Sequence, residues 1–76
     1  MNVYINSRGD VLAVFVSYRD RYAVFVRPAG KLEFESKDRR VFPIRETRAE
    51  AEEDMHIYAT TRSHDISWTF VENWKG

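Results

Sequence analysis

The sequence contains no cysteine, so disulfide bonds and thiolate-ligated metal sites are excluded. No apolar run approaches the roughly 20 residues that a membrane-spanning helix requires. The N-terminal stretch MNVYINSRGD has neither the cationic start nor the apolar run of a signal peptide. Small secreted domains usually depend on disulfide cross-links. We therefore expect a cytoplasmic protein.

Glycine-rich loops and an excess of one charge are also missing. Gly9, Gly30 and Gly76 stand alone, so no phosphate-binding loop is present. The net charge is zero, whereas a dedicated nucleic-acid-binding protein normally carries a basic excess. The distribution is uneven, with a balance of +4 over residues 1–48 and −4 over residues 49–76. Two ends of opposite charge suit different partners.

The residue types of an active site occur without the spacing that chemistry requires. Ser63, His64 and Asp65 are consecutive, and neighbouring side chains diverge, whereas a nucleophilic triad needs hydrogen-bond contact between its members. The three residues are more typical of a polar turn that ends a helix than of a triad. His56 and His64, even with Asp65 or Asp54, lack the spacing typical of a metal site. We expect no catalytic residue, no metal site, no cofactor and no enzymatic activity.

The most prominent feature present is residues 11–26, VLAVFVSYRDRYAVFV, which consists of two apolar runs around a charged triplet. β-Branched and aromatic residues dominate both runs, so the segment predicts a β-hairpin. With Tyr18 opposite Tyr22 across a three-residue loop, the expected pairs are Val16 with Val24, Val14 with Val26, and Phe15 with Phe25. One face then carries Leu12, Val14, Val16, Tyr18, Tyr22, Val24 and Val26, and the other carries Val11, Ala13, Phe15, Ala23 and Phe25. Both faces are apolar.

Other segments predict further strands and one helix. Short strands are expected at residues 3–5, 31–35, 41–44 and 66–71, where apolar and polar residues alternate or β-formers cluster between turn residues. Thr47 and Glu50 form a capping box before an amphipathic helix. Its apolar positions are Ala51, Met55, Tyr58 and Ala59. The sequence therefore predicts a single α+β domain over residues 1–76: an antiparallel sheet of four to six strands with one helix, residues 48–62, packed on one face.

One helix covers only one face of a sheet, so the second apolar face needs sheet curling, dimerisation or a partner. An apolar sheet face that the helix does not cover favours a protein-binding role. Three groups of partner-binding residues are expected: Phe15 and Phe25 on the uncovered face; Tyr18, Arg19, Arg21 and Tyr22 at the hairpin tip; and the acidic helix face Glu50, Glu52, Glu53 and Asp54. The acidic face reads first as a solvated surface that complements the helix dipole, rather than as paired catalytic carboxylates. Trp68 is in phase with Ile66 and Phe70 and belongs to the core. Trp74 is a further candidate partner-binding residue, as an exposed anchor or a packed lid.

Arginines interleaved with aromatic residues also suit nucleic-acid binding by a sheet. The alternative set is Arg21, Arg27, Lys31, Arg39, Arg40 and Arg45. Residues 40–58, RVFPIRETRAEAEEDMHIY, resemble the end of the AP2-type DNA-binding domain of phage integrases. That resemblance implies a sheet lying in the major groove, with Arg21, Arg27 and Lys31 at the matching positions. The chain departs from the pattern by an extra strand before the helix and by its zero net charge.

Together with the strand at 66–71, the same stretch is similar in layout to small phage-encoded inhibitors of bacterial RNA polymerase or of CRISPR surveillance complexes. That resemblance implies a non-enzymatic, partly acidic protein that occludes a host nucleic-acid-processing machine. The favoured function is therefore a protein-binding module of the phage or mobile-element inhibitor type. The alternatives are an AP2-like DNA-binding domain and a structural homodimer that closes its spare sheet face on itself.

Overall fold

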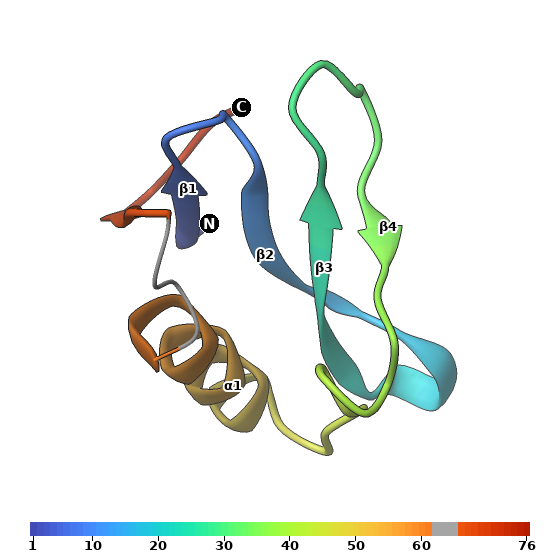
Figure 1. The fold of residues 1–76 in the computed structure, drawn as a ribbon. Helices are drawn as coiled ribbons and strands as arrows, with labels where there is room; N and C mark the ends of the chain where they lie inside the picture. Colours follow the sequence, from blue (N-terminus) through green and yellow to red (C-terminus); the bar gives the residue numbers. More distant parts are fainter. Residues whose placement is uncertain (62–65) are drawn as a thin grey trace.

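The structure, a computed structural model, describes residues 1–61 and 66–76. Its described strands form one antiparallel sheet in the order β4-β3-β2-β1-β5, and one helix lies against one face (Figure 1). The elements are β1 (Val3–Asn6), β2 (Val11–Val16), β3 (Tyr22–Arg27), β4 (Glu35–Ser36), α1 (Arg48–Thr61) and β5 (Trp68–Val71). The expected α+β fold with a single helix is confirmed.

The central hairpin forms with the expected faces but with a different register. Val16 pairs with Tyr22 and Val14 with Val24, so the strands are shifted by two residues from the predicted pairing. The shift arises at the tip. Arg19 and Asp20, rather than three residues, make the turn, and the Ser17 amide donates to the Arg21 carbonyl just behind it. Because side chains alternate with a period of two, a two-residue shift leaves every side chain on its expected face.

Two predicted strands are largely absent, and turns take their place. Of residues 31–35 only Glu35 is in a strand, because a turn closed by the Lys31 amide and the Pro28 carbonyl precedes it. Leu32, expected on an apolar face, is 94% exposed. Residues 41–44 form no strand either, since the Val41 and Phe42 amides both donate to the Asp38 carbonyl in a turn.

The turn at residues 38–42 directs Phe42 into the main core, where it is 1% exposed. Its ring meets the Tyr58 ring edge-on at 4.9 Å. After Phe42 the chain rejoins the sheet briefly, through a two-bond bridge between Tyr22 and Arg45. A segment expected to extend the sheet therefore closes the space between α1 and β3.

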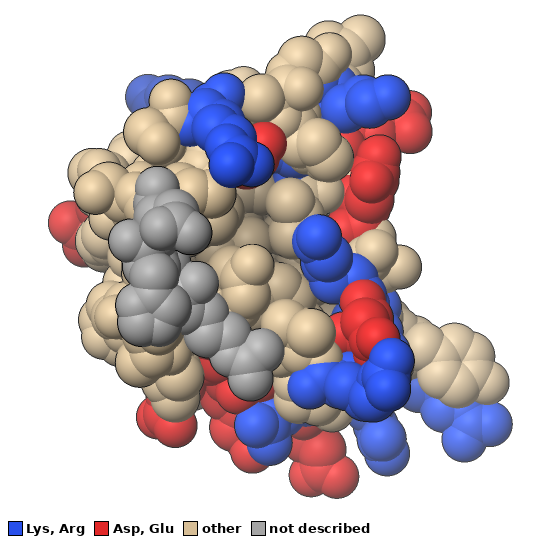
Figure 2. Space-filling model, in the orientation of Figure 1, with Lys and Arg blue, Asp and Glu red and all other residues tan. Residues whose placement is uncertain are grey.

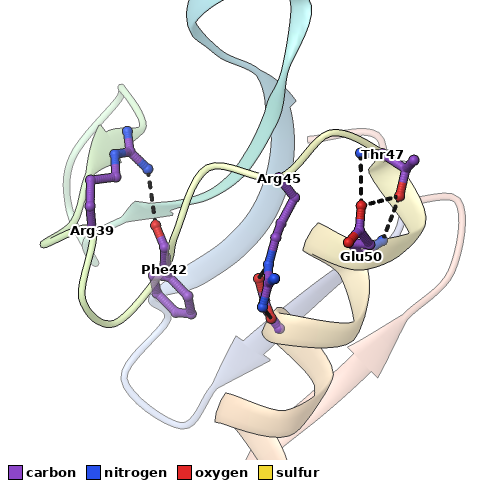
Figure 3. A network of polar contacts seen from close by, with 6 residues as sticks. Arg39, Phe42, Arg45, Thr47 and Glu50 are labelled. Atoms are coloured by element: carbon purple, nitrogen blue, oxygen red, sulfur yellow. Dashed lines mark hydrogen bonds and ion pairs between the residues drawn. The ribbon is translucent and has the colours of Figure 1, made fainter.

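The helix begins with the predicted capping box. The Glu50 amide donates to Thr47 Oγ1, and the Thr47 amide donates to the Glu50 carboxylate (Figure 3). The main core lies between α1 and the hairpin, and it contains Tyr4, Leu12, Val14, Val24, Val26, Phe42, Ala51, Met55 and Ala59. Tyr58 packs against this core, as expected. The predicted end of the helix at residue 62 and the turn Ser63-His64-Asp65 lie outside the described residues.

The second face of the sheet is covered in large part by the chain itself. Val3, Val11 and Ala13 are fully buried there. Phe34 crosses over this face with its ring 4.8 Å from Phe15, and Trp74 meets Phe34 edge-on at 6.4 Å. Phe15 is consequently half-buried, and Phe25 is half-buried beneath the Arg39 guanidinium, so neither ring lies on an uncovered face. The inference that one helix leaves a whole sheet face open is wrong, because Phe34 and the C-terminal tail supply a second layer.

β5 closes the other end of the sheet by pairing with β1. Trp68 is half-buried and packs edge-on against Tyr58 at 6.2 Å, in line with its expected core position. Phe70, predicted to share that role, is 49% exposed because α1 packs over β1, β2 and β3. Both ends of the chain lie beside β1 (Figure 1), and the Trp74 amide donates to the Met1 carbonyl.

Candidate protein-binding surfaces

The hairpin tip projects from the sheet and displays the expected aromatic and basic side chains. Tyr18 is 68% exposed, and the Arg19 guanidinium stacks on its ring at 5.2 Å. The turn, η1 (Tyr18–Asp20), is closed by the Arg21 amide donating to the Tyr18 carbonyl. Arg19 and Asp20 have φ values of 56° and 59°, in the left-handed region that side chains other than glycine rarely adopt. The tip is therefore a tight, defined turn.

Tyr22, the fourth residue expected at the tip, lies differently. It is half-buried against the main core, and the Arg48 guanidinium stacks on its ring at 5.1 Å. Arg48 also donates to the Val14 carbonyl. The structure thus separates an outward tip, Tyr18 to Arg21, from an inward Tyr22.

Most of the arginines proposed for nucleic-acid binding contact other parts of the chain. Arg27 stacks on Phe34 and Trp74, and Arg39 stacks on Phe25 and donates to the Phe42 carbonyl. Arg40 and Arg45 are paired with Asp38 and Asp54 respectively, and Asp38 holds the pKa of the Arg40 guanidinium above its ordinary value by hydrogen bonding. Arg21 and Lys31 remain exposed. Figure 2 shows the basic side chains along the side formed by β4 and the hairpin, with carboxylates among them.

Trp74 is held in the second layer rather than projecting into solvent. It is half-buried between Phe34 and the Arg27 guanidinium, which lies 5.0 Å from the Trp74 ring centre. Of the two roles that the sequence allowed, packed lid and exposed anchor, this position corresponds to the lid.

The acidic run on α1 divides into two pairs. Glu50 belongs to the capping box, and Asp54 makes a two-point ion pair with Arg45 (Figure 3). Hydrogen bonding to Asp54 raises the pKa of the Arg45 guanidinium above its ordinary value. Glu52 and Glu53 make no hydrogen bond or ion pair with another described side chain. They are the two carboxylates of the run that remain available to a ligand.

Glu52 and Glu53 border a groove between α1 and the β1–β5 part of the sheet. The groove encloses about 630 Å³, and Tyr4, Phe70 and Met55 contribute its apolar surface. The Tyr4 and Phe70 rings lie 5.2 Å apart. His56 lines the same groove, and its Nδ1 hydrogen-bonds with the Tyr4 hydroxyl. Burial raises the pKa of Tyr4 above its ordinary value.

The sequence does not predict this groove, although it predicts the acidic side of it. The sequence predicts Glu52 and Glu53 as partner contacts, Tyr4 as part of a short strand, and Phe70 as a core residue in phase with Trp68. Tyr4 and Phe70 are distant in sequence and face each other only because β1 pairs with β5. No local pattern in the sequence could have shown this meeting, because it depends on the pairing of β1 with β5.

In the described part of the chain, no group of three or more His, Asp or Glu side chains is placed to hold a metal ion. His64 and Asp65, considered for such a site, lie outside the described residues. No helix among residues 1–61 and 66–76 is long and apolar enough to cross a bilayer. No family model, curated protein or solved structure matches the chain.

Proposed function

We propose that the chain is a non-enzymatic protein-binding module that contacts its partner through the hairpin tip, Tyr18 to Arg21. The observation that carries this proposal is the left-handed backbone of Arg19 and Asp20 beneath the exposed Tyr18 ring. A left-handed conformation costs a residue other than glycine about 1–2 kcal/mol, and an Asn-Gly turn would avoid most of that cost. Local strain of this kind is concentrated at functional sites.

The side chains at the tip have the chemistry of a binding hot spot. Tyrosine and arginine are enriched among the residues that dominate binding energy. The Tyr18 ring offers a large contact area with little side-chain entropy to lose, and Arg19 stacks on it in the free protein. Val16, at the end of β2, adds an apolar residue that is 53% exposed. Such a tip fits a shallow pocket on a partner protein.

We further propose that the partner belongs to a host nucleic-acid-processing machine, which the module inhibits by occlusion. Two features support this target class. Glu52 and Glu53 make no ion pair with another side chain in the part of the chain that the structure describes, and a site built for phosphates attracts such carboxylates. Four of the five arginines considered for nucleic-acid binding, in turn, contact carboxylates or aromatic rings of the chain itself, which favours a protein contact over a phosphate contact.

Capture from a bacterial lysate with quantitative mass spectrometry tests the proposal. The wild-type bait should enrich a subunit of a nucleic-acid-processing complex, and the Tyr18→Ala/Arg19→Ala variant should lose it. The matched control is Lys31→Ala/Leu32→Ala, which alters two exposed residues away from the tip. Equal enrichment by all three baits would refute the role of the tip.

Competition separates the remaining alternatives. Added duplex DNA should release the captured subunit without binding to the module. If the module instead binds duplex DNA at low salt, with affinity falling steeply as salt rises, the DNA-binding alternative is correct. A mass in solution that rises with concentration would favour the structural homodimer.

A further inference from the structure

The two edges of the sheet differ in how they are protected. β4 is two residues long and stands among Lys31, Glu33, Glu35 and Lys37. Charges and short length are the usual means by which an edge strand avoids pairing with another chain. β5, Trp68–Val71, consists of Trp, Thr, Phe and Val, without a charge or a proline. No further strand lies beyond it in the described part of the chain.

The side chains beside β5 have a definite chemistry. Phe70 is paired with Tyr4, so both point to the face on which α1 lies. Ala49, Glu52, Glu53 and His56 line the opposite wall of the groove, at helical spacings of three and four. The groove therefore combines an aromatic floor with a wall that carries two carboxylates. Its Tyr4 hydroxyl is already satisfied by His56.

From this arrangement we infer that β5 and the groove bind an extended, basic segment of a partner protein. The segment adds as a strand along β5, so its backbone pairs with the edge of β5 that no described strand occupies. Alternate side chains then point to the face of Phe70, because strand side chains alternate between faces. A Lys or Arg at such a position can stack over the Phe70 ring and reach the Glu52 and Glu53 carboxylates.

Charge complementarity selects this occupant over others. Glu52 and Glu53 would repel an acidic segment or a nucleic-acid backbone. A second copy of β5 would bring a second pair of these carboxylates to the same face, which disfavours self-pairing. The inference concerns a surface separate from the hairpin tip, and it does not depend on the tip for its success or failure.

A peptide titration tests the inference. The probe is a blocked peptide of about eight residues that alternates Lys with Val, long enough to pair with the whole of β5. Its control alternates Glu with Val. Binding is followed by backbone amide NMR of the labelled protein. The basic peptide should shift resonances of residues 68–71 and 49–56, whereas the acidic peptide should leave them unchanged.

Matched variants give the expected size of the effect. Glu52→Gln/Glu53→Gln should weaken binding by about tenfold, since two partly exposed ion pairs are lost. Phe70→Ser should weaken it as well, and Phe70→Leu should weaken it less. Glu33→Gln/Glu35→Gln removes the same charge at the β4 edge and should bind as wild type. Tyr18→Ala/Arg19→Ala should also bind as wild type, which distinguishes this site from the hairpin tip.

Several results would overturn the inference. Equal binding of both peptides would show that charge does not select the occupant. An equal loss in Glu33→Gln/Glu35→Gln would show that the attraction is non-specific. Concentration-dependent shifts at residues 68–71 without peptide would identify a second copy of the chain as the occupant. The fold of each variant is checked by its amide spectrum before titration.

Discussion

Arg45 and Asp54 hold the long connection before α1 against the body of the helix. Arg45 Nε donates to Asp54 Oδ2 at 2.8 Å, and Arg45 Nη2 donates to Asp54 Oδ1 at 2.9 Å. The Asp54 side chain is 14% exposed, whereas the Arg45 side chain is 40% exposed. The backbone of Arg45 also bridges to Tyr22 in β3. One residue therefore connects the helix, the connection and the sheet.

We expect Arg45→Ala and Asp54→Ala each to lower the free energy of unfolding, and the double variant to lower it by less than the sum. Two-point contacts between arginine and a carboxylate are stronger than single ones. A double-mutant cycle in urea measures this coupling. The comparison pair is Asp38 and Arg40, whose side chains are 47% and 90% exposed and which should show no measurable coupling. Similar coupling in both pairs would contradict the expectation.

Thr47→Ala should destabilise the protein by about 1 kcal/mol, because its hydroxyl satisfies the Glu50 amide at the start of α1. Thr47→Ser should retain nearly all of the stability. Thr60→Ala, which removes a hydroxyl bonded to the His56 carbonyl in the same helix, should cost less. Urea unfolding measures all three. Equal losses at both threonines would mean that the cap contributes nothing specific.

Phe42→Ala should cost about 3–5 kcal/mol, because the ring fills the space between α1 and β3. A small domain has little more stability than this, so we expect partial unfolding at room temperature. Phe42→Leu should fold and lose less. Leu32→Ala is the counterpart at an exposed side chain and should change stability by less than about 0.5 kcal/mol. Thermal unfolding followed by circular dichroism measures the three stabilities. A loss in Leu32→Ala as large as that in Phe42→Ala would contradict the expectation.

Arg19→Asn/Asp20→Gly should stabilise the protein by about 1–2 kcal/mol, since Asn-Gly adopts the left-handed turn with less strain. The same change should reduce capture of the partner, because it removes the arginine that stacks on Tyr18. Tyr18→Ala should reduce capture without the gain in stability. A variant that gains stability and keeps full capture would separate the strain from the function.

Asp10 should make stability depend on pH. The Asn6 side chain, and then the Ala29 amide, hydrogen-bond to its carboxylate and lower its pKa below the ordinary value of 3.8. A pKa depressed in the folded state adds stability that is present above the unfolded value and lost as pH falls through the folded value. The difference in unfolding free energy between wild type and Asp10→Asn should therefore shrink from neutral pH to about pH 3. An unchanged difference would contradict this.

The sequence predicts elements whose stabilising contacts are local or periodic. The capping box of Thr47 and Glu50, the apolar stripe through Met55 and the two faces of the hairpin depend on spacings of two to four residues, and all are present in the structure. The hairpin register depends on which residues turn the chain. Neither left-handed position is a glycine, since they are Arg19 and Asp20, so the sequence does not mark the turn. The predicted register therefore differs from the observed one by two residues.

Other features depend on contacts between distant residues, which a pattern cannot show. The alternation at residues 31–35 placed Leu32 and Phe34 on one face of a strand, yet Leu32 is exposed and Phe34 crosses to the second sheet face. The groove requires Tyr4 and Phe70 to meet across the β1–β5 pairing. The run of acidic residues therefore predicts one wall of the groove, whereas no local pattern predicts its aromatic floor.

The position of β1 between β2 and β5 has a consequence for synthesis of the protein. β5 leaves the ribosome after every other element of the sheet, so β1 remains unpaired on one side while α1 and the hairpin are already available to associate. An unpaired strand in a partly made chain is a site of misassembly. β1 contains no charged residue that would keep its open edge from pairing wrongly. Only the addition of β5 covers that edge.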